Sequence, residues 1–412
     1  MFEFDEFDSW KFLNKNSIYA MKHLSFIIVA YASTTVTAIR FLKDYEINLD
    51  LSPEDRYNDL IVDFNDTVWQ YYNENIKDKT ALTDVLYKLA AKRGPENAEQ
   101  QGEIEGLARL SKLPLPFVQS IQMLYELQTI MIPVVNFTDA EAAFEFLPEE
   151  YKPLATLPWR GPGCTGILAM NKNDGTVYHA RNLDFSPVDI MTKLVYNGIF
   201  TKNGVEIFRS QMIAGYTMAI TGTAGGQIDG YAIERNTRYT DHTKGFDEMI
   251  HNLIDGRLLN GWTVRKILEN EVDYESAINA LKTQPYASAE YAIVSGVKKG
   301  TILSRNPDNV AHVQELGSKN FDERDDYIIM TNFDFFWHDA REYLDPTGGQ
   351  LLHPRRIAAQ KLLNATEEGS LDGEKLFEII NAPGVLADTV FQAIINVEQG
   401  MWNVSMPDIV EN

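Results

Sequence analysis

Residues 164–184 read CTGILAMNKNDGTVYHARNLD, and this stretch decides how the chain folds. Two segments rich in apolar residues flank the Asn-Asp-Gly tripeptide at 173–175, which is a strong turn signal between antiparallel strands. The sequence therefore predicts a β-hairpin with strands over 164–170 and 176–185.

The predicted hairpin brings Cys164 near two charged side chains. With Asp-Gly as the turn pair, Cys164 faces Phe185, and Arg181 points to the same face of the sheet because side chains alternate along a strand. Asp184 is close in backbone terms but points to the other face, unless a one-residue slip or a bulge brings it round. A thiol held near an Asp and an Arg is the strongest functional signal in the chain.

Cys164 is the single cysteine among 412 residues. A lone buried cysteine is usually a small hydrophobe without chemistry, whereas a nucleophile needs neighbours that activate its thiolate. No disulfide can form within a chain that has one Cys. The sequence contains no CxxC, no HExxH and no His pair on one helical face, so we predict no metal site and no cofactor.

The composition is that of a globular protein. The length suits one large domain or two lobes, and 44% apolar residues supply a sizeable core. The net charge of −22 argues against a nucleic-acid partner, because phosphate binding needs clustered Lys and Arg. The sequence pI of about 4.7 makes the molecule nearly neutral in an acidic compartment, which reduces its repulsion from an anionic lipid surface. The simpler interpretation of the acidity is solubility.

The amino end has the pattern of a secretory leader. Met21 and Lys22 precede an apolar run at 24–32 and a small-residue exit that ends at Ala38. We expect residues 1–38 to be a leader whose signal peptide begins at Met21; the alternative is an internal apolar helix. Four Asn-x-Ser/Thr sequons fit secretion as possible N-glycosylation sites: Asn65, Asn136, Asn364 and Asn403.

The predicted secondary structure changes from mainly helical to mixed strand and helix at Cys164. Residues 39–163 read mainly helical and include one helix between Pro116 and Pro133 that is apolar on most sides. Such a helix is usually core; the alternative is a lipid-contacting surface. From residue 164 onward, strands with turn signals alternate with helices, including one helix over 264–281. This arrangement predicts an α+β fold of packed sheets with helical layers.

A series of motifs resembles one known family. Residues 164–167, 174–175 and 178–184 resemble the start of the catalytic subunit of the acid ceramidase and N-acylethanolamine acid amidase family. Further stretches fall in the family's order: 47–51, 124–127, 214–216, 221–222, 234–235, 331–334, Trp337 and 355–356. The resemblance covers most of residues 45–400.

The resemblance implies the αββα sandwich of N-terminal nucleophile hydrolases, which mature by cutting their own chain. Here the cut would lie between Gly163 and Cys164. It would separate a helical amino-side subunit, residues 39–163, from a catalytic subunit, residues 164–412, which would stay together as a non-covalent heterodimer. A glycine suits the cut because, having no Cβ, it leaves its carbonyl open to attack and tolerates strain.

The resemblance also implies the roles of the site residues. Cys164 would attack the amide carbonyl and form a thioester that water hydrolyses. Arg181 would favour the thiolate and lower the pKa of the new α-amine, and Asp184 would hold that amine. Asn332 would donate a side-chain N–H to the oxyanion, and Glu234 matches the family's acidic site residue.

Each role has a plainer alternative. Without the family resemblance, we would interpret Asn332 as a turn cap and Glu234-Arg235 as a surface ion pair. We interpret Arg355-Arg356 as structural and leave both outside the site.

The chain departs from the family in four places. Gly166 stands where the family usually has Ser, a connector is inserted between Leu127 and Cys164, and His353-Pro354 stands where the family has Asp-Asp before the Arg pair. The disulfide that joins the subunits of the ceramidase branch cannot form. The missing disulfide favours the N-acylethanolamine amidase branch.

We therefore expect a lysosomal or extracellular enzyme of the secretory pathway that hydrolyses N-acylethanolamines to fatty acid and ethanolamine. The alternatives are an acid ceramidase, a catalytically silent lipid-binding relative, and a bile-salt or penicillin amide hydrolase. The expected partners are the lipid amide substrate, the chain's own cleaved amino-side subunit and, transiently, a membrane surface.

Overall fold

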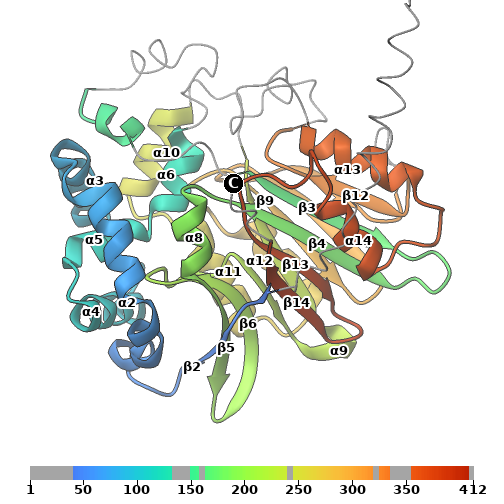
Figure 1. Ribbon diagram of the computed structural model, residues 1–412, viewed down its shortest axis with the longest axis horizontal. Helices are drawn as coiled ribbons and strands as arrows, with labels where there is room; N and C mark the ends of the chain where they lie inside the picture. The colour runs from blue at the N-terminus through green and yellow to red at the C-terminus, as the bar shows by residue number, and fades with distance from the viewer. Residues whose placement is uncertain are drawn as a thin grey trace, which may run out of the picture. The chain divides into compact units, whose positions relative to one another are not determined.

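Two β-sheets form the centre of the molecule (Figure 1). The computed structural model describes residues 40–131, 149–156, 163–238, 245–318, 324–334 and 354–407, all of which belong to one unit. The leader predicted over residues 1–38 and most of the predicted connector lie outside these ranges. The α+β class predicted from the sequence is confirmed, since helices and both sheets make up the described residues.

The smaller sheet contains the predicted nucleophile hairpin. Its strand order is β1 (Arg40–Phe41), β14 (Met401–Met406), β13 (Thr389–Asn396), β4 (Val177–Asp184), β3 (Cys164–Met170) and β12 (Tyr327–Met330). Every neighbouring pair is antiparallel. The hairpin β3–β4 is therefore central, with strands on both sides of it.

The larger sheet has eight strands. Its order is β11 (Val310–Glu315), β10 (Lys299–Arg305), β9 (Glu290–Gly296), β8 (Tyr231–Thr237), β7 (Thr221–Ala224), β6 (Val205–Ile213), β5 (Val195–Lys202) and β2 (Asp44–Asn48). The sequence analysis missed β2, which comes from the amino-side part and pairs parallel with β5.

The hairpin exists, but its predicted register was wrong by two residues. Cys164 pairs with Leu183 rather than Phe185. The loop is longer than a two-residue turn, because the N–H of Gly175 donates to the carbonyl of Asn171 at 2.7 Å and that of Asn171 donates to the carbonyl of Thr176 at 2.9 Å. A shift of two residues keeps every side chain on its predicted face.

Buried apolar side chains hold the sheets and helices together. A cluster between the sheets joins Leu168 of β3 and Met330 of β12 to Ile293 of β9. On its other face, the smaller sheet packs against α13 (Pro354–Ala365) and α14 (Gly373–Ile380). The larger sheet packs against α11 (Asn260–Asn270) and α12 (Tyr274–Thr283).

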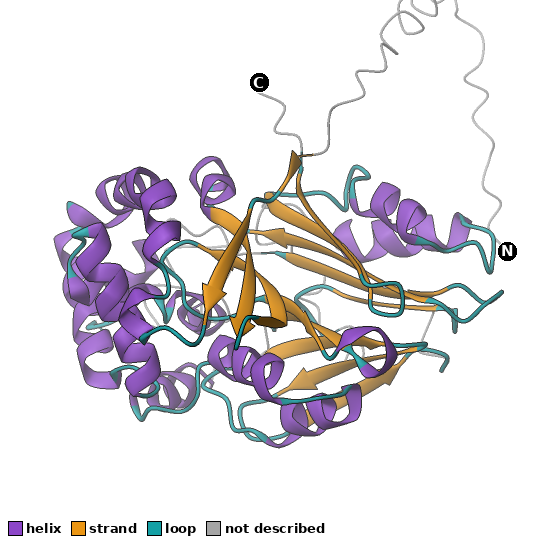
Figure 2. Ribbon diagram, turned by 90° about the horizontal axis from the view of Figure 1, so that it is seen from below, coloured by secondary structure: helices purple, strands orange, loops and turns teal. Residues whose placement is uncertain are grey.

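The helices of the amino-side part gather at one end of the sheets (Figures 1 and 2). They are α2 (Asn58–Tyr72), α3 (Thr80–Arg93), α4 (Ala98–Ser111), α5 (Leu115–Ile121) and α6 (Leu124–Met131). The remaining described helices are α8 (Val188–Leu194), α9 (Gly226–Asp229) and α10 (Gly245–Ile254), with short non-α turns at Pro53–Asp55, Asn73–Lys77 and Lys152–Thr156.

Two helices predicted as continuous are broken. The helix expected between Pro116 and Pro133 is split into α5 and α6, and at the break the Gln122 side chain donates to the carbonyl of Gly215 at 2.8 Å. The helix expected over 264–281 is split into α11 and α12, because Asp273 and Ser276 form a capping box that starts a new helix.

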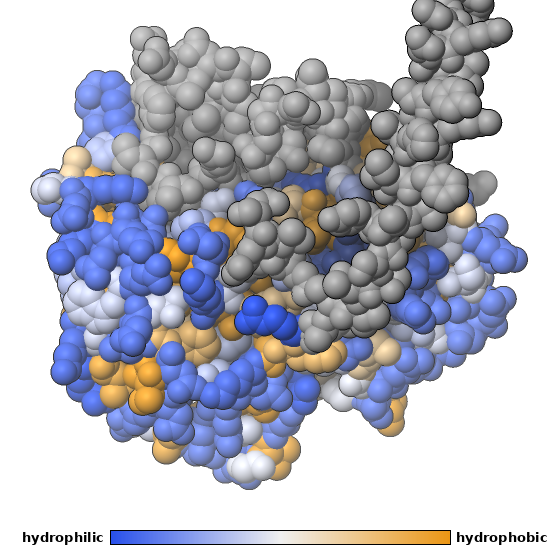
Figure 3. All heavy atoms as spheres, in the orientation of Figure 1, coloured by the Kyte–Doolittle hydropathy of each residue, from blue (hydrophilic) through white to orange (hydrophobic). Residues whose placement is uncertain are grey.

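None of the described helices is long and apolar enough to cross a membrane. On the face seen in Figure 3, hydrophilic residues predominate and hydrophobic residues form separate patches.

A buried ionic network joins the amino-side helices to the later part of the chain. Arg265 of α11 binds both carboxylate oxygens of Glu103 on α4, at 2.5 and 2.6 Å. Arg56 bridges Glu103 and Glu99 at 2.9 and 2.6 Å, and Lys266 of α11 binds Glu99 at 2.5 Å. Burial disfavours the charge on Glu99, but hydrogen bonds from Lys266 and Arg56 outweigh it and lower its pKa to about 2.

Replacing Glu99 with Gln should lower the free energy of unfolding at neutral pH, as measured by urea titration. The pKa of Glu99 is about 2 in the fold against an ordinary value of 4.5, so its contribution is complete above pH 4.5 and is lost as the pH falls toward 2. Glu105→Gln, an exposed position on the same helix, is the matched control and should change stability by less than about 0.5 kcal/mol. A Glu99→Gln protein as stable as the parent at neutral pH would contradict a stabilising role for the ionised Glu99.

Candidate active site

Cys164 begins β3 and is fully buried. Its sulfur has two polar neighbours at 3.8 Å, the Tyr125 hydroxyl and Nη2 of Arg181. Its backbone N–H donates to Oδ1 of Asn332 at 2.8 Å, and its carbonyl accepts from Nη1 of Arg355 at 2.8 Å. Four side chains from distant parts of the sequence thus meet at one residue.

Arg181 lies on the same face of the hairpin as the sulfur, opposite Gly166 across the ladder. Main-chain carbonyls fix its guanidinium: Nη1 donates to Ile220 at 3.1 Å and Nη2 donates to Arg235 at 3.0 Å. The hydroxyl of Thr221 accepts a further hydrogen bond from it. Because these acceptors belong to β7, β8 and the residue before β7, the larger sheet positions the cation that faces the sulfur.

Asp184 ends β4 and points to the face opposite the sulfur, as alternation predicts. Its carboxylate accepts from Nη1 of Arg355 at 3.0 Å, and this same nitrogen binds the Cys164 carbonyl. The second nitrogen of Arg355 donates to Oδ1 of Asn332 at 2.9 Å. Asp184 is therefore connected to the main chain of Cys164 through Arg355 rather than by direct contact with the sulfur.

Arg355 was left outside the predicted site, and the structure brings it inside. It is the second residue of α13, and its side chain is buried against the peptide that precedes Cys164. A Cβ on Gly163 would lie 2.4 Å from Nη1 of Arg355, so a larger residue there would displace the guanidinium. The signal that could have found Arg355 was the place of the Arg pair in the family's order of motifs.

Asn332 follows β12 and is fully buried, and its side chain binds distant segments rather than capping a turn. Its Oδ1 accepts from the N–H of Cys164, and its Nδ2 donates to the carbonyl of Thr237 at 2.8 Å. A side-chain amide nitrogen carries two N–H groups, and the bond to Thr237 uses one of them.

Glu234 and Arg235 are also fully buried, which overturns the interpretation as a surface pair. The side chain of Glu234 lies beside Arg181, with Oε1 of Glu234 4.0 Å from Nε of Arg181. Arg235 points away and pairs with Glu290 at 2.9 Å and with Glu126 of α6 at 3.1 Å. Within this dipeptide, Glu234 approaches the predicted site, and the charged group of Arg235 ties the site's strand to the amino-side helices.

Tyr125 was part of the family match but was given no role. Its hydroxyl lies near the sulfur and donates to the carbonyl of Arg235 at 3.1 Å, the carbonyl that also accepts from Arg181. Burial raises its pKa well above the ordinary value, so the phenol stays neutral and can donate a hydrogen bond.

The surroundings of Cys164 favour its protonated thiol. Burial raises its pKa, Arg181 works in the opposite direction, and the carboxylates of Asp184 and Glu234 raise it further. Ionisation therefore needs a proton acceptor beside the sulfur, together with the guanidinium that stabilises the resulting anion.

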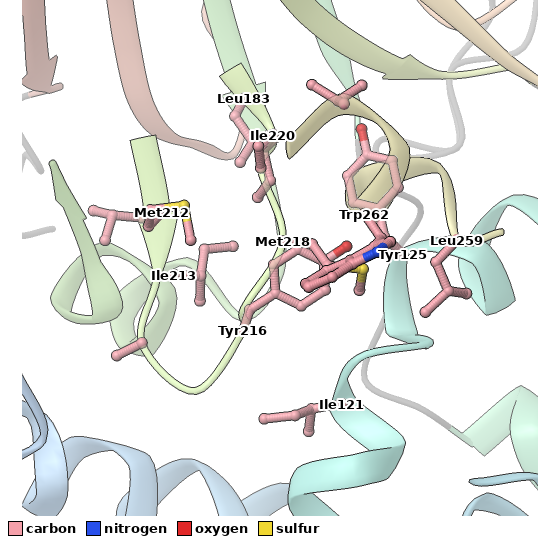
Figure 4. Packing of buried hydrophobic residues seen from close by; sticks show 14 of the residues in the cluster. Ile121, Tyr125, Leu183, Met212, Ile213, Tyr216, Met218, Ile220, Leu259 and Trp262 are labelled. Atoms are coloured by element: carbon pink, nitrogen blue, oxygen red, sulfur yellow. The ribbon is translucent and has the colours of Figure 1, made fainter. Parts of the chain in front are cut away.

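An apolar pocket reaches the sulfur's surroundings from the helical side. The amino-side part supplies Val68, Tyr71, Phe117, Ile121, Leu124 and Tyr125, and the later part supplies Phe185, Met191, Leu194, Ile213, Ala214, Tyr216 and Ile220. In Figure 4, Ile121 lies across from Ile213 and Tyr216, and Tyr125 extends past them. Because the Tyr125 hydroxyl lies 3.8 Å from the sulfur, this residue borders both the pocket and Cys164.

The four sequons differ in their surroundings. Asn403 is exposed on β14. Asn364 is exposed near the end of α13, where it accepts a hydrogen bond from Tyr327 at 2.6 Å. Asn65 is half-buried within α2, and Asn136 lies outside the described residues.

The Ser that the family usually has at position 166 would crowd this site. A Cβ there would lie 2.4 Å from Cδ1 of Ile293 and 2.7 Å from Oε1 of Glu234. Gly166→Ser should therefore destabilise the protein by about 1–3 kcal/mol in urea unfolding, as overpacked cores do. Adding Ile293→Val, which removes the closest atom, should recover part of that loss; a double variant no more stable than Gly166→Ser would contradict this account.

Comparisons with known proteins find the same two kinds of enzyme that the sequence motifs resemble. No family model matches the chain. The chain is 26% identical over 367 residues to an N-acylethanolamine-hydrolyzing acid amidase of Caenorhabditis elegans, covering 86% of this chain and 88% of that protein. It is 24% identical over 389 residues to the acid ceramidase of Homo sapiens, covering 88% and 86% of the two chains. It is 26% identical over 343 residues to the N-acylethanolamine-hydrolyzing acid amidase of Mus musculus, covering 82% and 80%.

Among solved structures, a Caenorhabditis elegans N-acylethanolamine-hydrolyzing acid amidase ortholog aligns at 25% identity with a TM-score of 0.49, covering 60% of this chain and 100% of that one. The sequence relatives alone span more than four-fifths of the chain. The chain is thus similar over most of its length to N-acylethanolamine acid amidases and acid ceramidases, which confirms the resemblance identified from its motifs.

Proposed function

We propose that this protein is a cysteine amidase of the N-terminal nucleophile type, which cuts its own chain before Cys164 and then hydrolyses N-acylethanolamines. The relatives support an amide hydrolase of the acid amidase and ceramidase type. The packing of helices on the outer faces of two stacked sheets is that expected of an αββα sandwich. The single observation that carries the proposal is the convergence of Arg181, Asn332 and Arg355 on the sulfur and main chain of Cys164.

The peptide before Cys164 is arranged for self-cleavage. The carbonyl of Gly163 accepts a hydrogen bond from the backbone N–H of Asp184 at 2.8 Å. When the sulfur attacks this carbonyl carbon, a donor is in place for the negative charge that develops on the oxygen. The C–S bond forms, the peptide C–N bond breaks, and the Cys164 nitrogen takes up a proton and becomes an α-amine. Water then hydrolyses the thioester, releasing the carboxylate of Gly163 and regenerating the thiol.

The new α-amine would remain within reach of Oδ1 of Asn332, which already accepts from this nitrogen. It can take the proton from the thiol and later deliver it to the leaving amine. Arg181 stabilises the thiolate formed in the first step. In this scheme Asp184 acts through Arg355, which holds the carbonyl of Cys164 and fixes the new terminus.

The apolar pocket supports a long acyl chain as the acid part of the substrate. It is lined by side chains of α2, α5 and α6 on one side and by residues around α8 and β6 on the other. An acyl chain lying there would place its carbonyl at the end of the pocket that Tyr125 shares with the sulfur. Its burial would contribute about 0.8 kcal/mol for each methylene group.

We assign the amine part of the substrate to ethanolamine. The two pieces of the cut chain would be held by the Arg265–Glu103 and Arg235–Glu126 pairs, so the heterodimer does not need the disulfide of the ceramidase branch. Ceramide remains the second candidate, because the human acid ceramidase matches 88% of the chain. The proposal includes a secretory-pathway location, lysosomal or extracellular, and transient membrane contact during substrate uptake.

The decisive experiment is acid-triggered cleavage of the purified full chain. Incubation at about pH 4.5, close to the ordinary pKa of a carboxyl group, should yield two fragments, one ending at Gly163 and one beginning with Cys164, as read by mass spectrometry and amino-terminal sequencing. Cys164→Ala should abolish the cut, and Cys164→Ser should slow it because a hydroxyl is the weaker nucleophile. A chain that stays uncut and inactive would support the silent relative, and a cut elsewhere would point to an outside protease.

The pocket assignment predicts chain-length selectivity in the mature enzyme. Ile121→Trp should raise the KM for palmitoylethanolamide about tenfold, the effect of excluding roughly two methylene groups, and should change a short-chain amide much less. Val205→Trp, at an exposed position of the β5–β6 hairpin, is the control. Equal effects on the KM of long and short amides would contradict binding of the acyl chain in this pocket. Faster turnover of ceramide than of palmitoylethanolamide would show that the amine part of the substrate is that of ceramide and not ethanolamine.

A further inference from the structure

One buried titratable residue beside the site has no part in the mechanism above. His179 lies on β4 two residues before Arg181 and on the same face of the strand. Its Nε2 lies 2.9 Å from Oε2 of Glu234, and its Nδ1 lies 3.1 Å from the hydroxyl of Ser295. The side chains of His179 and Glu234 are fully buried. Both ring nitrogens have partners, so the ring cannot rotate without losing both hydrogen bonds.

The carboxylate that His179 binds lies between it and Arg181. Oε1 of Glu234 is 4.0 Å from Nε of Arg181, and neither of these two atoms has a hydrogen-bond partner among the described residues. The neighbouring nitrogen of the same guanidinium, Nη2, lies 3.8 Å from the sulfur of Cys164. Glu234 and the sulfur therefore face adjacent nitrogens of one cation and compete for it.

The position of the carboxylate depends on how it is held. On one side Gly166 leaves the space that a Cβ would occupy, 2.7 and 2.8 Å from the two carboxylate oxygens. On the other side the bond from His179 keeps Oε2 turned away from Arg181. Without that bond the carboxylate is free to rotate and close the 4.0 Å gap, because a buried carboxylate without a hydrogen bond is costly.

We propose that His179 is a positioning residue: by holding Glu234, it keeps the guanidinium of Arg181 directed at the sulfur of Cys164. If Glu234 formed a direct ion pair with Arg181, the guanidinium would move from the sulfur and its field there would be offset by a nearby negative charge. Both changes disfavour the thiolate. This inference rests on the proposed function, since it concerns the reactivity of Cys164 as a nucleophile.

The test uses His179→Leu and His179→Gln, each made in the full chain and in a Glu234→Gln background. His179→Leu should reduce the rate of self-cleavage and the kcat for palmitoylethanolamide about 10- to 100-fold, the effect of one lost hydrogen bond to a buried charge, with KM nearly unchanged. His179→Gln, which keeps an N–H donor, should restore most of the rate. In the Glu234→Gln background, His179→Leu should have less than about a threefold further effect, because no carboxylate remains to draw Arg181 away.

Tyr178→Leu provides the control for packing. This residue is next to His179 but packs on the other face, with α14. It should lower thermal stability without lowering kcat. A parent enzyme that cuts itself and turns over substrate while His179→Leu matches its kcat would overturn the inference and leave the proposed function intact. The inference would also be overturned if the losses of kcat from His179→Leu and Glu234→Gln multiplied in the double variant. It would likewise be overturned if His179→Leu folded poorly while His179→Gln folded normally but did not recover the rate. A parent that neither cuts itself nor hydrolyses the amide would overturn the proposed function, and the inference with it.

Discussion

The guanidinium of Arg181 is the interaction on which the site depends. It extends from the smaller sheet to the larger one and donates to the carbonyls of Ile220 and Arg235, while Nη2, which binds Arg235, also faces the sulfur of Cys164. A buried cation needs hydrogen-bond acceptors, and here the larger sheet supplies them, so the spacing of the two sheets and the position of the charge are set together. The environment of Cys164 is therefore a property of the sheet packing as much as of the residues in contact with it.

A second arginine organises the opposite face of the hairpin. Arg355 comes from α13, far along the sequence, and joins Asp184, Asn332 and the carbonyl of Cys164. One arginine thus faces the side chain of Cys164 and the other faces its main chain. The hairpin lies between these two buried cations, each of which donates hydrogen bonds to acceptors in the core.

Sequence reasoning was strongest where a signal was local. The Asn-Asp-Gly tripeptide predicted the nucleophile hairpin, and alternation placed Cys164 and Arg181 on one face. The register was missed because the turn takes two more residues than the tripeptide suggests. The helix boundaries at Gln122 and Asp273 were missed because they depend on a side chain reaching another segment and on a capping box. The strand β2 carries no alternating pattern strong enough to separate it from the helices that follow it.

The site itself could be predicted only in part. Arg355 and Tyr125 make contacts with Cys164 over 191 and 39 residues of chain, and nothing local in the sequence marks them as neighbours of a thiol. The sequence also did not predict the burial of charged residues. Glu234-Arg235 has the pattern of a solvated ion pair, whereas both residues lie in the interior. The family resemblance supplied the motifs that composition and periodicity could not.

The parallel pairing of β2 with β5 has a consequence for how the molecule is assembled. If the chain is cut at residue 163, the amino-side piece still contributes Asp44–Asn48 as the outermost strand of a sheet whose other seven strands belong to the second piece. Removing that piece would uncover the backbone donors and acceptors of β5 and the apolar surface that Ile47 covers, and such a bare sheet edge promotes aggregation. In a cut chain the amino-side piece would thus act as a strand donor that completes the sheet of the second piece.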